Sequence, residues 1–140
     1  MGRILAIDYG SKKCGLAVTD PLRIVVTGLD TISTDKLLDW LSTYLDKEEV
    51  DVIVIGEPVH KDGQPTFLHE QIVGLERKLR KLYPDVSLER QDEFYTSQRA
   101  KRSILDSGYG RKKRRDKAMV DRVAAAIILE DYLSDAHGTS

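Results

Sequence analysis

The pattern of apolar and polar positions along the chain predicts five strands. Two runs of four consecutive apolar residues, Ile4–Ile7 and Val52–Ile55, fit strands buried on both faces, because neither face of such a strand tolerates polar groups. Shorter runs at Leu16–Val18 and Ile24–Thr27 predict two strands that form an antiparallel meander with the first. The alternation of apolar and polar residues in Val86–Glu89 is typical of an edge strand.

Apolar residues at helical spacing predict the helices that connect and follow these strands. One helix follows the third strand, a second has its apolar positions from Leu68 to Leu82, and a third begins at Thr96 or Ser97. The last helix spans Lys117–Leu133. Strands one, four and five can therefore form a parallel core with helical crossovers, covered by helices on both faces. The sequence predicts the α/β fold class.

The composition of the 140 residues, with 41% hydrophobic and 32% charged side chains, is that of a soluble globular protein. We expect a single domain over residues 1–135 and a flexible tail over residues 136–140. No apolar stretch approaches the ~20 residues of a membrane span, and the N-terminus lacks a signal-peptide pattern. The single cysteine, Cys14, excludes an internal disulfide and favours a reducing, cytoplasmic setting. The three histidines lack zinc-site spacing, so any metal would be held by carboxylate oxygens.

Charge is distributed unevenly, although the formal net charge is only −1. The segment Arg99–Lys117 holds nine basic and two acidic residues, whereas the rest of the chain holds 13 basic and 21 acidic residues. A basic segment on an otherwise acidic protein favours a polyanionic partner. Its uninterrupted run, Arg111–Arg115, precedes the last helix and is either a solvated loop or a nucleic-acid contact.

Acidic residues follow all three predicted parallel strands: Asp8 follows the first, Glu57 the fourth, and Glu93 the fifth. Ligands of parallel α/β sheets gather at these carboxyl ends. Asp121 is a fourth candidate, because positions 121, 125, 128 and 132 share one face of the last helix. Alanines at positions 124 and 125 would let that helix lie close to the sheet.

Two carboxylates about 4 Å apart repel each other by roughly 4 kcal/mol at an effective dielectric near 20. Mg²⁺ would remove this penalty, because it prefers carboxylate, water and phosphate oxygens. Two such ions can activate a water and stabilise the leaving oxygen of a phosphodiester. Three of these four acids also have other interpretations. Asp8 would be a solvated hairpin residue, Asp121 would interact with its helix dipole, and Glu57 would be an extra metal ligand or, as we favour, a solvated loop acid.

The turn after Asp8 has the composition of a phosphate-binding turn. Gly10 and Gly15 let the backbone turn tightly and let a phosphate approach closely. Lys12 and Lys13 place two cations in the same connection.

The chain resembles the YqgF/RuvX family in four segments, which occur in the family's order and span nearly the whole sequence: IDYGSKKCGLAVTD, GEPVHKDG, DEFYTSQRA and DRVAAAIILEDYL. The resemblance implies a ribonuclease H-like fold with sheet order 3-2-1-4-5 and a relationship to Holliday-junction resolvases. It also implies a metal-dependent nuclease that matures the 5′ end of pre-16S rRNA, with nucleic acid and ribosomal particles as partners. By position, the resemblance makes Asp8, Glu93 and Asp121 the catalytic carboxylates, which would bind Mg²⁺ or Mn²⁺.

Three positions depart from the family pattern. Phe94 stands where an arginine commonly follows the glutamate, Glu57 replaces a usual apolar residue, and Arg122 stands where a small residue is common. Phe94 removes one expected phosphate contact, whereas Arg122 adds one or pairs with an acid. The predicted nucleic-acid-binding residues are basic side chains of the first turn, the basic run and the last helix: Lys12, Lys13, Arg111, Lys112, Lys113, Arg114, Arg115 and Arg122.

Other functions fit parts of this pattern. A phosphate-binding ATPase of the actin and sugar-kinase type also has a first strand that ends in an Asp-x-Gly turn, but it needs a second domain of similar fold, for which 140 residues leave no room. A non-catalytic RNA-binding ribosome assembly factor would use the same basic surface, but it gains nothing from clustered acids. A Holliday-junction resolvase acting on branched DNA is the alternative within the nuclease class, and the sequence leaves the choice of substrate open.

Overall fold

The structure is a computed structural model that describes residues 2–57, 66–92 and 117–138, without the side chains of residues 92, 117–122 and 135–138. Its described elements follow one another in the order β1 (Arg3–Asp8), β2 (Lys13–Thr19), β3 (Val26–Ser33), the 3₁₀ turn η1 (Thr34–Lys36), α1 (Leu37–Lys47), β4 (Val50–Glu57), α2 (His69–Leu82), β5 (Ser87–Asp92) and α5 (Lys117–Gly138).

The five strands form one mixed sheet in the order β3-β2-β1-β4-β5. β1 pairs with β4 and β4 with β5 in parallel, while β1, β2 and β3 pair antiparallel. The predicted meander, parallel core and strand order are all confirmed. The register sets Asp8 opposite Gly56 and Glu57 opposite Asp92, so β1, β4 and β5 end at the same edge of the sheet.

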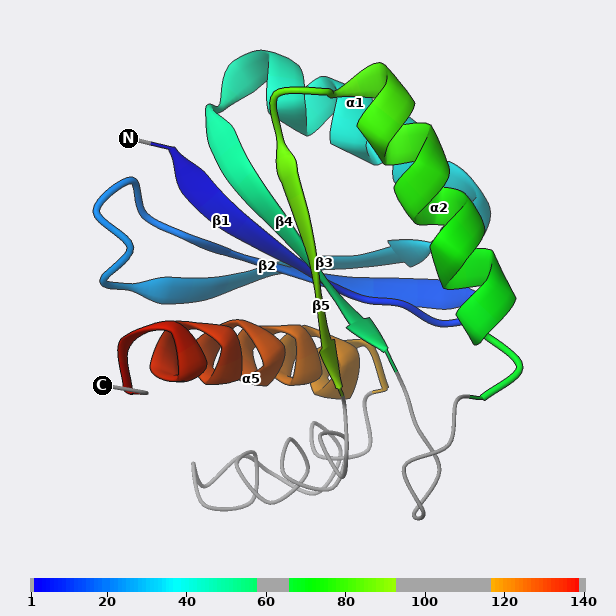
Figure 1. Cartoon of the computed structure of the whole chain (residues 1–140). Helices are drawn as coiled ribbons and strands as arrows, with labels where there is room; N and C mark the ends of the chain where they lie inside the picture. Colours follow the sequence, from blue (N-terminus) through cyan, green and yellow to red (C-terminus); the bar gives the residue numbers. More distant parts are fainter. Residues whose placement is uncertain (1, 58–65, 93–116, 139–140) are drawn as a thin grey trace.

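Helices cover both faces of the sheet, as Figure 1 shows. On one face, alternate strand residues such as Leu5 and Ile7 form a buried cluster with side chains of α1 and α2. On the other face, Ile4 and Ala6 form a second cluster with side chains of α5, including Ala125. Both apolar runs of the sequence are thus explained, because the central strands β1 and β4 are buried on both sides. The predicted α/β class, a five-stranded mixed sheet with helices on both faces, is confirmed.

The third strand begins later than the sequence predicts. It starts at Val26 instead of Ile24 and continues past Gly28 to Ser33. The Asp20 carboxylate accepts hydrogen bonds from the backbone N–H groups of Ile24 (2.7 Å) and Val25 (2.8 Å). These bonds hold both residues in the turn, where their side chains are exposed.

The helices agree with the predicted apolar stripes in most places. Leu68, Ile72, Leu75 and Leu79 are buried, whereas Leu82, predicted to share that stripe, is exposed at the end of α2. The alanines at 124 and 125 are buried against the sheet as predicted. α5 continues to Gly138, and the predicted helix after Thr96 or Ser97 lies outside the described residues. None of the helices among the described residues is long and apolar enough to span a membrane.

Candidate active site at the carboxyl edge of the sheet

Asp8 is the last residue of the central strand β1 and is half-buried. Its partners in register are Gly15 on β2 and Gly56 on β4. The residues directly opposite Asp8 on both adjoining strands are thus glycines, which have no side chain. Side chains alternate between faces along a strand, so Asp8 shares the face of Ile4 and Ala6, which is the face that α5 covers.

Asp121 lies near the start of α5, on the helix that covers this face. Figure 1 shows that α5 runs opposite to β1, from the edge at which β1 ends toward the edge at which β1 begins. Near the end of α5, burial and the charge of Glu89 raise the pKa of the Tyr132 phenol, against a smaller opposing effect of Arg23. Arg23 Nε in turn donates to the Gly2 carbonyl oxygen beside the start of β1 (3.3 Å). The start of α5, which carries Asp121, therefore lies on the side of the sheet where β1 ends at Asp8.

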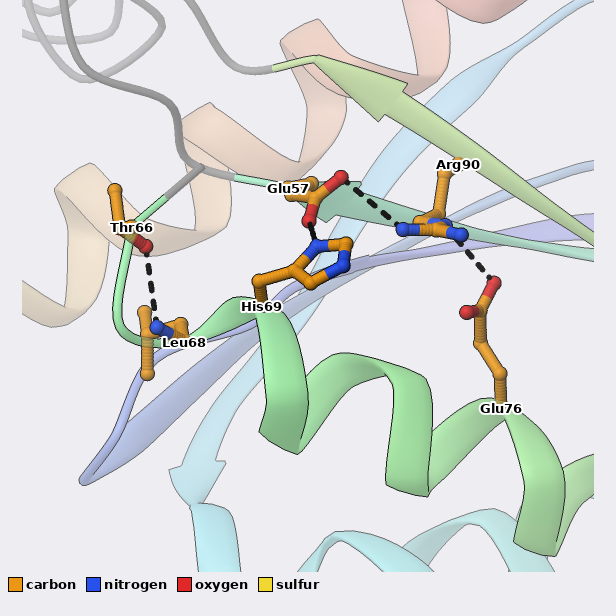
Figure 2. Close-up of polar contacts among 6 residues, drawn as sticks. All are labelled: Glu57, Thr66, Leu68, His69, Glu76 and Arg90. Carbon is orange, nitrogen blue, oxygen red and sulfur yellow. Dashed lines mark hydrogen bonds and ion pairs between the residues drawn. The ribbon is translucent and has the colours of Figure 1, made fainter. Parts of the chain in front are cut away.

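Glu57 ends β4 on the opposite face of the sheet, where it belongs to a buried ionic network. Figure 2 shows its two carboxylate oxygens with separate partners: Oε1 contacts His69 Nδ1, and Oε2 accepts from Arg90 Nη1 at 3.3 Å. Arg90 Nε also pairs with Glu76 Oε2 at 3.3 Å. Glu57 is 8% exposed and Glu76 3% exposed, whereas Arg90 and His69 are partly exposed, so these contacts join β4, β5 and α2 at the margin of the core.

The favoured interpretation of Glu57 as a solvated loop acid is therefore wrong. Glu57 lies on the same face of β4 as Ile53 and Ile55. It therefore faces α2 and not the α5 face that holds Asp8. Both of its oxygens have protein partners, and its position on the opposite face means that it does not share a metal ion with Asp8. Glu57 is a structural acid that fixes the end of β4 against α2.

The Glu76–Arg90 pair was missed by sequence reasoning. Glu76 interrupts the apolar side of α2 between Leu75 and Leu79, which is a weak signal for a buried charge. Its partner, 14 residues later on β5, is not recognisable from spacing, because the pair forms only where an α2 turn crosses the edge strand.

The turn between β1 and β2, which follows Asp8 directly, holds two predicted basic residues. Lys12 lies directly before β2 and Lys13 is its first residue, and both are exposed. The turn itself is fixed, because Thr34 Oγ1 donates to the Gly10 carbonyl oxygen (2.7 Å) and the Thr34 N–H to the Lys12 carbonyl oxygen (2.9 Å). A Cβ on Gly10 would lie 2.5 Å from the Lys13 carbonyl oxygen, so only glycine fits there.

The other predicted site residues are only partly placed. Glu93 and the basic run Arg111–Arg115 lie outside the described residues, although β5 ends at Asp92, directly before Glu93. Asp121 and Arg122 are placed in α5 by their backbone alone. Within the described part of the chain, no group of three or more His, Cys, Asp or Glu side chains is arranged to hold a metal ion. The donor chemistry nevertheless fits Mg²⁺ or Mn²⁺, since all three predicted ligands are carboxylates.

A comparison with known families matches this chain from residue 2 to residue 135 to the RuvX model, which is described as Holliday junction resolvase. The chain belongs to the RuvX family. Relatives in Porphyromonas gingivalis, 47% identical over 135 residues, and Flavobacterium johnsoniae, 44% identical over 134 residues, both carry the name "Putative pre-16S rRNA nuclease". Each alignment covers 96% of this chain, and 98% and 97% of those relatives.

Among solved structures, YeaZ from Pseudomonas aeruginosa is similar to this RuvX-family chain with a TM-score of 0.48 and 18% sequence identity. The match covers 76% of this chain and 51% of that one.

Proposed function

We propose that this protein is a metal-dependent endonuclease that hydrolyses phosphodiester bonds during maturation of the 5′ end of pre-16S rRNA in the cytoplasm. The observation that supports this most directly is the position of Asp8. It ends the central parallel strand, has glycine at its register on both neighbouring strands, and faces the helix that carries Asp121. The two relatives that match over nearly their full length are named pre-16S rRNA nucleases, and these names support pre-rRNA as the substrate.

In this proposal, Asp8, Glu93 and Asp121 would hold the metal through carboxylate oxygens. Bound Mg²⁺ or Mn²⁺ would supply an activated water and charge stabilisation for the leaving oxygen. The chain's own contribution is to fix the ligands. Asp8 is held by a strand buried on both faces, so its carboxylate needs little reorganisation when the substrate arrives.

The basic residues would bind the sugar-phosphate backbone around this centre. Lys12 and Lys13 lie on the fixed turn next to Asp8, and Arg122 follows Asp121 in α5. Arg111–Arg115 precede α5 directly and would extend the same track. Each cation that neutralises a phosphate on a single strand steepens the slope of log K against log salt by roughly 0.7.

A second candidate substrate is branched DNA, because the matching family model is described as a Holliday junction resolvase. Incubation of the purified chain with Mg²⁺ or Mn²⁺ and a panel of pre-rRNA fragments, single-stranded RNA and four-way DNA junctions separates the two. We expect metal-dependent cleavage of pre-rRNA that is lost in Asp8→Asn and retained in Asp46→Asn, which changes an exposed acid of α1. Cleavage of junctions alone would establish the resolvase, and cleavage by Asp8→Asn equal to that of the parent would contradict the site.

A further inference from the structure

A cavity of about 710 Å³ opens at the same edge of the sheet, on the face opposite the Asp8 carboxylate. It lies between the first turn, the start of α1 and the exposed side of α2, and its lining includes Tyr9, Lys12, Leu38, Gln71, Gly74 and Lys78. Tyr9 in its lining follows Asp8 directly in the chain, so the cavity and the candidate active site lie at the same edge of the sheet. None of its lining residues belongs to the predicted carboxylate set.

The walls of this cavity are fixed by hydrogen bonds between its separate segments. Tyr9 Oη donates to Gln71 Oε1 at 3.3 Å, which joins the end of β1 to α2. Thr34, also in the lining, anchors the Gly10–Lys12 turn through its N–H and its hydroxyl. A pocket whose walls are held in this way loses little conformational entropy when a ligand enters.

Gly74 is the observation that points to a ligand. It lies in the middle of α2, where glycine is less favourable than alanine. A Cβ built on Gly74 would meet no atom within 4 Å, so no close packing demands glycine. The missing side chain instead leaves the wall of the cavity clear between Gln71 and Lys78, which share this face of the helix.

The lining combines the groups that recognise a nucleotide. Lys12 and Lys78 supply two cations at exposed positions, and Asp35, whose carboxylate accepts from the Ser33 hydroxyl, offsets one of them. The Tyr9 ring and the Leu38 side chain supply an apolar surface, and the Gln71 amide supplies hydrogen-bonding atoms. Aromatic rings stack on bases of any sequence, and lysines bind the adjoining phosphates.

We propose that this cavity binds one nucleotide of the single-stranded substrate, next to the nucleotide at Asp8. The inference rests on the proposed nuclease function and adds a subsite to it. The strand must cross the sheet edge from the Asp8 face to the Tyr9 face. A single strand can follow such a path, whereas a duplex has a persistence length of about 50 nm and resists the bend.

The test is the binding of a fluorescent single-stranded RNA of about a dozen nucleotides to the full chain, measured by anisotropy without added divalent metal. Gly74→Leu places a side chain in the cavity and should weaken binding by roughly five- to 150-fold, the range expected for one stacked base. Lys78→Ser should weaken binding and flatten the salt slope by roughly 0.7. The matched control is Lys47→Ser, which removes an exposed lysine at the far end of α1 and should leave both quantities unchanged.

The variant Gly74→Ala distinguishes weaker RNA binding from a folding defect. This variant should raise the melting temperature by about 2–4 °C, because alanine is the better helix former, while binding RNA more weakly than the parent. If Gly74→Leu and Lys78→Ser bind like the parent, the subsite is wrong and the nuclease proposal stands. If the parent binds no RNA, both fail. If a free nucleoside monophosphate competes as well as an oligonucleotide, the cavity takes free nucleotides and the strand subsite is overturned.

Discussion

Asp8 and Glu57 end neighbouring parallel strands at the same edge of the sheet, yet their surroundings differ completely. Asp8 faces α5 between two register glycines, whereas Glu57 faces α2 and has both carboxylate oxygens engaged by His69 and Arg90. The difference arises because side chains alternate between the faces of a sheet and the two acids fall on opposite sides. An acid at a strand end is therefore a candidate ligand only if it lies on the face where the other ligands gather.

The largest expected effect is the difference in cleavage rate between a variant of Asp8 and a variant of Glu57. Asp8→Asn should lower the cleavage rate by about a hundred-fold or more, because a metal-bound carboxylate controls several kcal/mol of transition-state stabilisation. Glu57→Gln should stay within several-fold of the parent, since its amide keeps an acceptor for the network. Single-turnover cleavage of a pre-rRNA fragment, with circular dichroism to verify folding, makes the comparison. Equal losses in both variants would mean that the two acids serve one centre.

The next effect concerns stability on the Glu57 side. Arg90→Met leaves two buried carboxylates, Glu57 and Glu76, without their shared cation. Removing one partner of a fully buried pair costs about 3–5 kcal/mol, but the Arg90 side chain is 37% exposed, so we expect roughly 2 kcal/mol and a melting temperature about 6 °C lower.

Differential scanning calorimetry measures this shift, and the exposed Arg77→Met on α2 serves as its control. A melting temperature equal to that of the parent would show that water already solvates the Glu57 network, which would remove the contrast with Asp8.

The smallest effect involves a third acid, Asp20, which follows β2 at the opposite edge. Backbone N–H groups, that of Val25 above all, hold the pKa of Asp20 below its usual 3.8. A lowered pKa stabilises the folded state at neutral pH, and this contribution is lost as the pH falls through the folded-state pKa.

Asp20→Asn should accordingly melt below the parent at pH 7, and the gap should close as the pH falls below about 4. Melting curves between pH 2 and pH 7 test this sign, with Asp46→Asn in α1 as an exposed control. A gap that widens in acid would contradict a turn held by the ionised carboxylate.

The sheet was predictable because both apolar runs are long enough to require burial on two faces. The placement of Asp8 followed directly from that prediction, since the end of a buried strand is fixed by the strand. The start of β3 was not predictable to the residue. Ile24 and Val25 have the composition of a strand, and their conformation is decided by hydrogen bonds to Asp20, which follows the previous strand.

Contacts between side chains of distant segments could not be predicted from the sequence, for a different reason. Nothing near Glu57 indicates that Arg90 and His69 will converge on it, because their positions depend on how α2 crosses β4 and β5. The cavity around Gly74 likewise needs three segments to be docked before its shape exists. Local pattern predicts elements and their ends, whereas charge pairing and cavities require the packed molecule.

The most direct test of the central claim is Mn²⁺ binding by the full chain, measured by the loss of the free-ion electron paramagnetic resonance signal in the parent, Asp8→Asn and Glu57→Gln. We predict that Asp8→Asn weakens Mn²⁺ binding at least about ten-fold, since it removes the charge of a ligand, whereas Glu57→Gln binds within about two-fold of the parent. Unchanged binding in Asp8→Asn, or loss of binding in Glu57→Gln alone, would contradict the assignment of the metal site to the α5 face.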